Sequence, residues 1–323
     1  MTLNGDFIRT GGVFDHNNGT ISFDSGDHAI RGSTVFNHLT KSGARGSLTF
    51  EANSNQTILG LLELRGRDAS NLLKLRSTVE GEQFNLDPQG ARDIAFLDVK
   101  DSDNLNSTKI SCTDTCVNSR NNTNWELPAP TLVIGDGETV TLGANETEFE
   151  SVTITGAGQL ITDHDITVTG DISLSDTAKI TAQTNDVTVS VGGNVTLSQE
   201  GEILNETSGK TVTLKFTGTN DQTLDQTNAS GQNNLKGNVL IDKDSGTVTL
   251  TSDLALNQIN LTQTLIIIQG TFDANGKAVT VRGITEVDGG TYEAGSGLQT
   301  FQSVGSSGRQ SRLLGGRQLR RNR

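Results

Sequence analysis

The feature that most constrains this chain is a series of short runs in which Val, Ile or Leu alternates with Thr or Ser. Period-two alternation puts the apolar side chains on one side of an extended segment and the hydroxyl groups on the other, which is the pattern of a half-buried strand. Val and Thr are both β-branched and favour the extended backbone. Gly- and Asn-rich clusters, which tolerate positive φ, separate the runs and allow sharp turns. Clear runs lie at residues 139–142, 152–155, 187–191, 212–214 and 248–250.

The spacing of the runs indicates how the strands are arranged. Steps of six to nine residues leave no room for the crossover helices of βαβ units. A parallel β-solenoid with three strands per coil would close one coil about every 20–28 residues. An antiparallel sandwich or barrel has strands about every 8–12 residues, so spacing alone does not exclude it. The uniformly short strands and the aromatic content of 4% favour the solenoid, because sandwich cores rely on buried aromatics. Strands are expected to start near Ile166, Ile172, Ile180, Val187, Val195, Ile203 and Val212.

Composition excludes several other classes of protein. Gly, Asn, Thr, Ser and Asp recur every few residues and would interrupt long helices, which rules out an all-α fold. No apolar run approaches the length of about 18 residues that a membrane span needs. The formal net charge of −13 argues against nucleic acid or an anionic membrane as a partner. We therefore predict an all-β protein without a membrane span.

Internal similarity supports a repeated fold. A tetrad with an apolar fourth residue recurs four times, and in the first two copies a glycine follows two residues later. Ordered recurrence of this kind is typical of a degenerate repeat. The tetrads lie at residues 27–30, 55–58, 221–224 and 298–301.

Two prolines at residues 128–130 mark a boundary, because proline lacks the N–H of a sheet ladder and fixes φ. We divide the chain into a β-solenoid unit at 1–127, a proline linker at 128–130 and a second β-solenoid unit at 131–305. Residues 306–323 hold six arginines and no acidic residue. This segment would suit a nucleic-acid-binding arm, but its Gly, Ser and Gln content and its lack of a repeat pattern favour a disordered Arg-rich tail.

Cys112 and Cys116 form the sharpest local feature. Three intervening residues allow a small loop disulfide if the chain turns between them, and a disulfide would imply an oxidising compartment. No further Cys or His lies nearby to complete a metal site, and a catalytic redox pair usually has two intervening residues. We expect a structural disulfide rather than free thiols.

No catalytic, cofactor-binding or metal-binding residue emerges from the remaining sequence. The four histidines show neither ligand spacing nor a nucleophile motif and are expected at the surface: His16, His28, His38 and His164. Alternate aspartates could hold Ca²⁺ weakly, since hard ions prefer oxygen ligands, but solvated turn residues are the favoured interpretation. These acidic pairs are Asp101/Asp103, Asp163/Asp165 and Asp242/Asp244.

Several of these segments resemble repeat units of very large secreted bacterial β-helix proteins, the filamentous-haemagglutinin-like adhesins and autotransporter-passenger-like surface proteins. Residues 97–102, the Cys112 and Cys116 pair, and residues 121–125 ending in Trp125 look like the end of one repeat unit, which would close the first unit. The block 213–283 is similar to another unit of the same proteins. These motifs are structural rather than catalytic, so no catalytic residue is carried over from the resemblance. The resemblance implies a right-handed parallel β-helix, an extracellular or cell-surface location and an adhesive or scaffold role.

The first residues show no basic segment followed by an apolar one, so we expect this chain to be a fragment of a longer secreted protein, with a cytoplasmic protein as the alternative. We expect a non-catalytic, adhesive or structural segment: a rigid stalk that binds glycans or other surfaces through many weak contacts and adjoins further repeats of its parent chain. The alternatives are a polysaccharide lyase or glycoside hydrolase on a β-helix, and a passive spacer. An enzyme predicts a clustered polar groove across adjacent coils, an adhesin predicts an exposed ligand-binding strip or loop, and a spacer predicts neither.

Overall fold

The computed structural model describes residues 1–203, 209–227, 235–256 and 263–301. In these ranges the chain forms 38 β-strands and no helix, and the named strands pair in parallel. The strands stack into a β-solenoid of about 12 turns, so the predicted all-β parallel solenoid with about three strands per coil is confirmed. The described residues include no helix with the length and apolarity needed to cross a membrane. The predicted Arg-rich tail at 306–323 lies outside the described residues.

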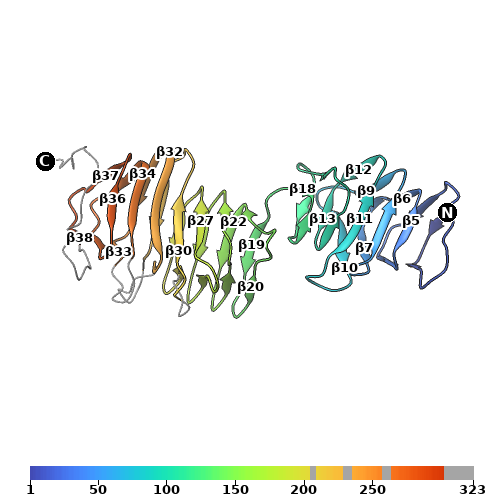
Figure 1. Cartoon of the computed structure of the whole chain (residues 1–323), viewed down its shortest axis with the longest axis horizontal. Helices are drawn as coiled ribbons and strands as arrows, with labels where there is room; N and C mark the ends of the chain where they lie inside the picture. Colours follow the sequence, from blue (N-terminus) through green and yellow to red (C-terminus); the bar gives the residue numbers. More distant parts are fainter. Residues whose placement is uncertain (204–208, 228–234, 257–262, 302–323) are drawn as a thin grey trace. The chain divides into compact units, whose positions relative to one another are not determined.

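The chain divides into two compact units, and the division falls between Pro130 and Thr131. Each unit has its own cluster of buried apolar side chains. Figure 1 shows that the strands of each unit lie side by side, so that each coil covers the one before it. We call residues 1–130 unit 1 and the residues from 131 onward unit 2.

Unit 1 has three faces, each formed by strands from successive coils. The first face contains β1 (Thr2–Leu3), β3 (Thr20–Phe23), β6 (His38–Ala44), β9 (Leu62–Gly66) and β12 (Arg92–Ala95), followed by the separate pair β15 (Ile110–Ser111) and β18 (Trp125–Glu126). The second contains β2 (Phe7–Ile8), β4 (His28–Arg31), β7 (Gly46–Phe50), β10 (Leu73–Ser77), β13 (Leu97–Val99) and β16 (Val117–Asn118). The third contains β5 (Thr34–Phe36), β8 (Asn55–Ile58), β11 (Phe84–Pro88), β14 (Ser102–Asn104) and β17 (Asn122–Thr123).

Unit 2 repeats this plan with a different set of faces. One run of stacked strands contains β19 (Thr131–Ile134), β22 (Ser151–Ile154), β25 (Ile172–Leu174), β28 (Val195–Leu197), β31 (Gln222–Asp225) and β37 (Thr291–Glu293). Another contains β21 (Glu148–Phe149), β24 (Ile166–Val168), β27 (Val187–Val191), β30 (Val212–Phe216) and β36 (Thr285–Val287). The remaining short sheets contain β20 (Thr139–Thr141), β23 (Gln159–Ile161), β26 (Lys179–Thr181) and β29 (Glu202–Ile203), and β33 (Leu254–Leu256), β35 (Val279–Val281) and β38 (Gln299–Phe301).

Two long strands, β32 (Asn238–Leu250) and β34 (Leu265–Asp273), pass through a corner and belong to both long runs. The first part of β32 pairs with β30 and its last part pairs with β31. The register between β32 and β34 shifts around residue 242, which lets the backbone bend without ending the strand.

Side chains alternate in direction along each strand, and the apolar side chains that point inward fill the interior of each unit. Leu75 lies opposite Leu48 on one side and Val99 on the other, and all three side chains are fully buried. Phe50 and Phe84 stack with ring centroids 4.4 Å apart. Because each fully buried side chain of this kind contributes about 1.5–3 kcal/mol, an in-register apolar column is the main force that holds successive coils together.

The corners between the second and third faces of unit 1 adopt positive φ in five coils. Each of these corners has a Gly, Asn or Asp in the left-handed region, the types that tolerate it best, and Arg120 (φ 81°) also adopts it at the last corner. The Gly, Asn and Asp residues are Gly32 (φ 81°), Asn53 (60°), Gly81 (84°), Asp101 (59°) and Asn121 (53°). A side chain at Gly32 would also lie 2.0 Å from the backbone oxygen of Arg9 in the preceding coil, so this corner excludes every other residue.

Candidate functional site

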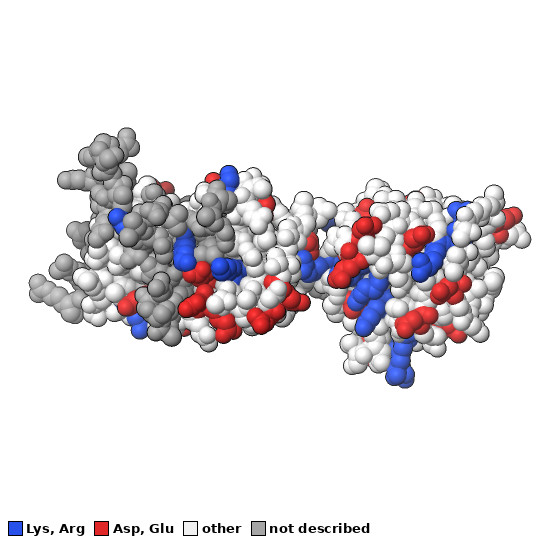
Figure 2. Space-filling view, turned by 90° about the horizontal axis from the view of Figure 1, so that it is seen from below, with Lys and Arg blue, Asp and Glu red and all other residues white. Residues whose placement is uncertain are grey.

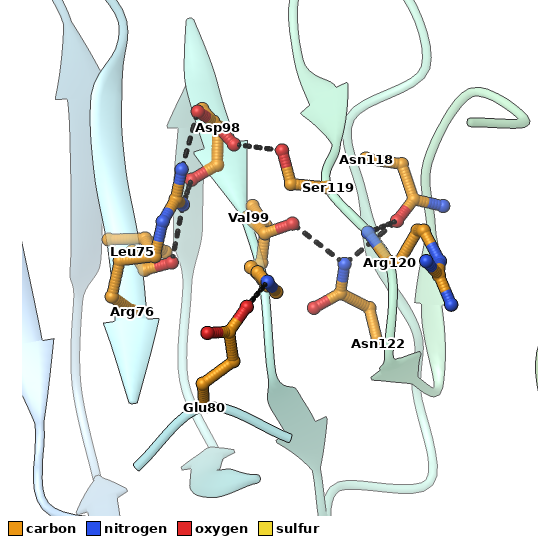
Figure 3. A network of polar contacts seen from close by, with 10 residues as sticks. Leu75, Arg76, Glu80, Asp98, Val99, Asn118, Ser119, Arg120 and Asn122 are labelled. Carbon is orange, nitrogen blue, oxygen red and sulfur yellow. Dashed lines mark hydrogen bonds and ion pairs between the residues drawn. The ribbon is translucent and has the colours of Figure 1, made fainter. Parts of the chain in front are cut away.

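A polar network crosses the second face of unit 1 and joins three successive coils (Figure 3). Arg76 of β10 donates from Nη2 to Oδ2 of Asp98 on β13 at 2.6 Å, and from Nη1 to the backbone oxygen of Asp98 at 2.7 Å. Ser119, just after β16, donates its hydroxyl to Asp98 Oδ1 at 2.6 Å. Both carboxylate oxygens of Asp98 are therefore engaged, and this carboxylate connects three coils.

The network continues toward the third face. Asn122 of β17 donates from Nδ2 to the backbone oxygen of Val99 and to Oδ1 of Asn118, both at 2.8 Å. Lys100 pairs with Glu80, and this hydrogen bond lowers the pKa of the Glu80 carboxyl. Glu80 lies in solvent, so the ion pair adds little to stability.

The corner above this network contains Asp101, which is 2% exposed. Asn121 donates from Nδ2 to Asp101 Oδ1 at 2.7 Å and to the backbone oxygen of Gly81 at 3.2 Å, while the Gly81 N–H donates to Asp101 Oδ2 at 3.2 Å. The prediction that Asp101 is a solvated turn residue is wrong, because its side chain joins the corners of the neighbouring coils. The other member of that pair, Asp103, lies partly exposed on β14, and burial raises its pKa.

Cys112 and Cys116 are joined by a disulfide between β15 and β16, with 5.6 Å between their Cα atoms. Both are 6% exposed and belong to the buried cluster of unit 1. The Leu97 N–H lies 3.3 Å from Cys116 Sγ, and the Phe96 N–H donates to the Thr115 hydroxyl at 3.2 Å. The loop that the disulfide closes therefore covers the corner of the preceding coil.

Aspartates in unit 2 cap the backbone of the next coil. Asp163 Oδ1 accepts from the N–H groups of Gln183 at 2.7 Å and Thr184 at 2.8 Å, and Asp165 Oδ1 accepts from the Thr188 N–H at 2.7 Å. The backbone hydrogen bond from Thr184 lowers the pKa of Asp163. The same contact, about one coil along the chain, is made by Asp136, Asp171, Asp186, Asp221 and Asp253.

The two aspartates of the third acidic pair make separate contacts. Asp242 forms an ion pair with Lys215 at 2.7 Å, and Asp244 accepts from Gln269 Nε2 at 3.2 Å. Across the part of the chain that the structure describes, no group of three or more His, Cys, Asp or Glu side chains is arranged to hold a metal ion.

The second residue of each predicted tetrad points into the solenoid. Gln222 is 1% exposed and donates from Nε2 to the backbone oxygens of Val191 at 3.1 Å and Gly193 at 2.6 Å, in the preceding coil. Gln56 similarly donates to the Gly32 oxygen at 3.2 Å. Sequence reasoning missed a further residue of this kind, the fully buried Gln263, although a glutamine followed by Thr and an apolar residue is the same signal. Gln263 donates from Nε2 to the backbone oxygens of Leu235 and Gly237. Gln299 donates from Nε2 to the backbone oxygens of Lys277, Ala294 and Gly297.

Two fully buried lysines occupy matching corners, one in each unit. Lys41 donates from Nζ to the backbone oxygens of Asp24 at 2.6 Å and Gly26 at 3.0 Å. Lys243 donates to the Asn220 oxygen at 2.8 Å and to Gln222 Oε1. Burial lowers the pKa of both ammonium groups. Each lysine lies where the register of its strand shifts, so its side chain fills and caps a bend.

His28 corrects one sequence prediction. It is 6% exposed, and its Nε2 lies 2.7 Å from Asp24 Oδ1. The expectation of a surface position is wrong because His28 stands two residues before the buried Ile30 and therefore faces the same side of β4. The other three histidines are partly exposed, and each contacts the backbone: His16, His38 and His164.

This arrangement can hold neighbouring coils in register. Glycoside hydrolysis by two carboxyl groups needs them on either side of one bond, with one of them protonated. Asp98, Asp101 and Asp163 instead accept hydrogen bonds from neighbouring coils. Comparison of the chain with protein-family models, curated proteins and solved structures finds no significant match. The resemblance to secreted bacterial repeat proteins therefore stays a prediction.

Proposed function

We propose that this chain is a non-catalytic structural and adhesive segment of a secreted bacterial surface protein, a rigid stalk that binds glycans or other surfaces multivalently. The observation that carries the proposal is the use of its polar side chains. Gln, Asp and Lys side chains contact the backbone of an adjacent coil, as the buried Gln222 and Lys41 and the partly exposed Asp163 do. Side chains used in this way stiffen a stack of coils and leave few groups for chemistry.

The surface charge is consistent with a stalk that stays soluble. Residues 131–305 contain 22 Asp or Glu and seven Lys or Arg, whereas residues 1–130 contain 16 and 12. Figure 2 shows acidic groups gathered on the visible face of unit 2 and both signs of charge interspersed on that of unit 1. Excess charge of one sign opposes self-association. A secreted location is supported by the disulfide, since such bonds persist in oxidising compartments.

The proposal is tested by incubating the full chain with acidic and neutral polysaccharides, with and without Ca²⁺, and measuring new reducing ends and retention on the insoluble polymers. We expect no turnover and retention on at least one polymer. Turnover above a heat-killed control would refute the non-catalytic role and favour the lyase or hydrolase alternative. Absence of both turnover and retention would refute the adhesive role and favour a passive spacer.

A further inference from the structure

The third face of unit 1 carries three polar side chains in one row whose polar atoms have no hydrogen-bond partner in the described part of the chain. Asn55 of β8, Asn85 of β11 and Asp103 of β14 lie directly opposite one another in the parallel register. Thr123 of β17 continues the row, and its hydroxyl accepts a hydrogen bond from Gln83 Nε2 at 2.9 Å. Asn55, Asn85 and Asp103 are each partly exposed. None of these three side chains has a hydrogen-bond or ion-pair partner among the residues described, and Asn55 Oδ1 is buried without one.

This row differs from the Asn and Asp side chains that hold unit 1 together. Asp27 accepts from the Ser47 N–H, Asp98 from Arg76, and Asn122 donates to a backbone oxygen. Polar groups that are partly withdrawn from water usually have a partner, so an unpartnered row across three coils leaves hydrogen-bonding capacity for a ligand.

A second row lies two residues further along the same strands. It contains Thr57 of β8 opposite Asp87 of β11, whose carboxylate accepts from Gln89 Nε2 at 3.0 Å and from Asn106 Nδ2 at 3.4 Å. Neither row contains Lys or Arg, and Asp87 and Asp103 are the only charged residues among these six positions. Together the rows present amide, hydroxyl and carboxylate groups, which include both donors and acceptors. Hydroxyl groups of a sugar also donate and accept, so they can match the groups of both rows that reach the surface.

We propose that these six residues form a binding strip for an uncharged polysaccharide that runs along the solenoid axis: Asn55, Thr57, Asn85, Asp87, Asp103 and Thr123. Coils repeat about every 4.8 Å, a distance comparable with the length of one sugar ring in an extended glycan, so successive sugars meet successive coils. The two carboxylates repel acidic polysaccharides. This inference rests on the proposed adhesive function and assigns it a site and a ligand class.

The test uses the full chain and measures Kd by calorimetry for soluble β-1,4-glucan, β-1,3-glucan and mannan oligosaccharides, with oligogalacturonate and chitosan oligosaccharides as acidic and cationic probes. The variants are Asn85→Ala and Asp103→Ala. The matched control is Glu63→Ala, which removes a partly exposed carboxylate from β9 on the first face. Thermal unfolding of each variant verifies that unit 1 stays folded.

We expect the wild-type chain to bind at least one neutral oligosaccharide. Each strip variant should weaken that binding about tenfold, equivalent to about 1.4 kcal/mol, whereas Glu63→Ala should leave it unchanged. Binding that both strip variants retain in full would overturn the strip and leave the adhesive function standing. Binding confined to the acidic or the cationic probe would overturn the uncharged ligand. No binding to any probe by the wild-type chain would overturn the strip, and if retention on polymers is also absent the adhesive function fails with it.

Discussion

Replacing Cys112 and Cys116 together by alanine should lower the free energy of unfolding of unit 1 by about 3 kcal/mol. The bond joins residues four apart in sequence, and closing so short a loop accounts for roughly 2 kcal/mol in the chain-entropy description. Loss of Cys116 Sγ leaves the buried Leu97 N–H without its acceptor, which adds about 1 kcal/mol. For a unit of this size, 3 kcal/mol corresponds to a Tm lower by about 10 °C.

Calorimetry of the full chain gives the size of this effect, and hydrogen exchange locates it. Protection should fall in β12 to β18 and stay unchanged in unit 2, which serves as the internal control because the two units have separate cores. Mild reduction of the wild-type chain should reproduce the effect. An unchanged unit 1, or an equal loss of protection in both units, would refute the conclusion that this loop stabilises its neighbouring coil.

Three other substitutions test the contacts between coils. Gln222→Leu should lower the free energy of unfolding, measured in urea, by about 3 kcal/mol, because two backbone oxygens and the Lys243 ammonium lose a hydrogen-bond partner in the core. A decrease of less than about 1 kcal/mol would contradict this role of Gln222. Burial lowers the pKa of Lys41 from its ordinary 10.5, so the unfolded chain keeps the lysine proton to a higher pH than the folded chain does. The free energy of unfolding of unit 1 should therefore rise with pH in the alkaline range below 10.5. Lys41→Met should reduce this increase of stability with pH. If the urea midpoint of the variant changes between neutral and alkaline pH as it does in the wild-type chain, the increase is not due to Lys41. Gly32→Ala should destabilise unit 1 more than Gly12→Ala, since both adopt positive φ but only Gly32 has backbone within 4 Å of the added methyl group; equal melting temperatures would show that close approach is unimportant.

Much of the fold could be predicted because its signals are local. The alternation at residues 187–191 defines a strand whichever residues lie beside it, and the structure places β27 there. Corner residues such as Asn53 and Asn121 follow from the tolerance of Asn for positive φ. Even the inward position of His28 follows from alternation with Ile30, although all four histidines were expected at the surface.

The candidate site could not be predicted in the same way, because it depends on which coil lies against which. Paired residues are 30 apart between Leu62 and Arg92 but 15 apart between Ile110 and Trp125. With such irregular coils, no fixed period in the sequence brings side chains together. The first acidic pair illustrates this limit, since Asp101 is buried whereas Asp103, two residues later, is partly exposed.

The sequence by itself determined the class of structure: short parallel-stacking strands, positive-φ corners and a boundary at the prolines, since alternation, β-branching and proline act within a few residues. Only the tertiary structure decided which polar groups meet, because hydrogen bonds between coils join residues about 20 to 30 positions apart. It thus separated the aspartates that cap the next coil from Asn55, Asn85 and Asp103, whose side chains have no hydrogen-bond partner among the residues that the structure describes. That difference depends on register, and register is set by the length of every coil.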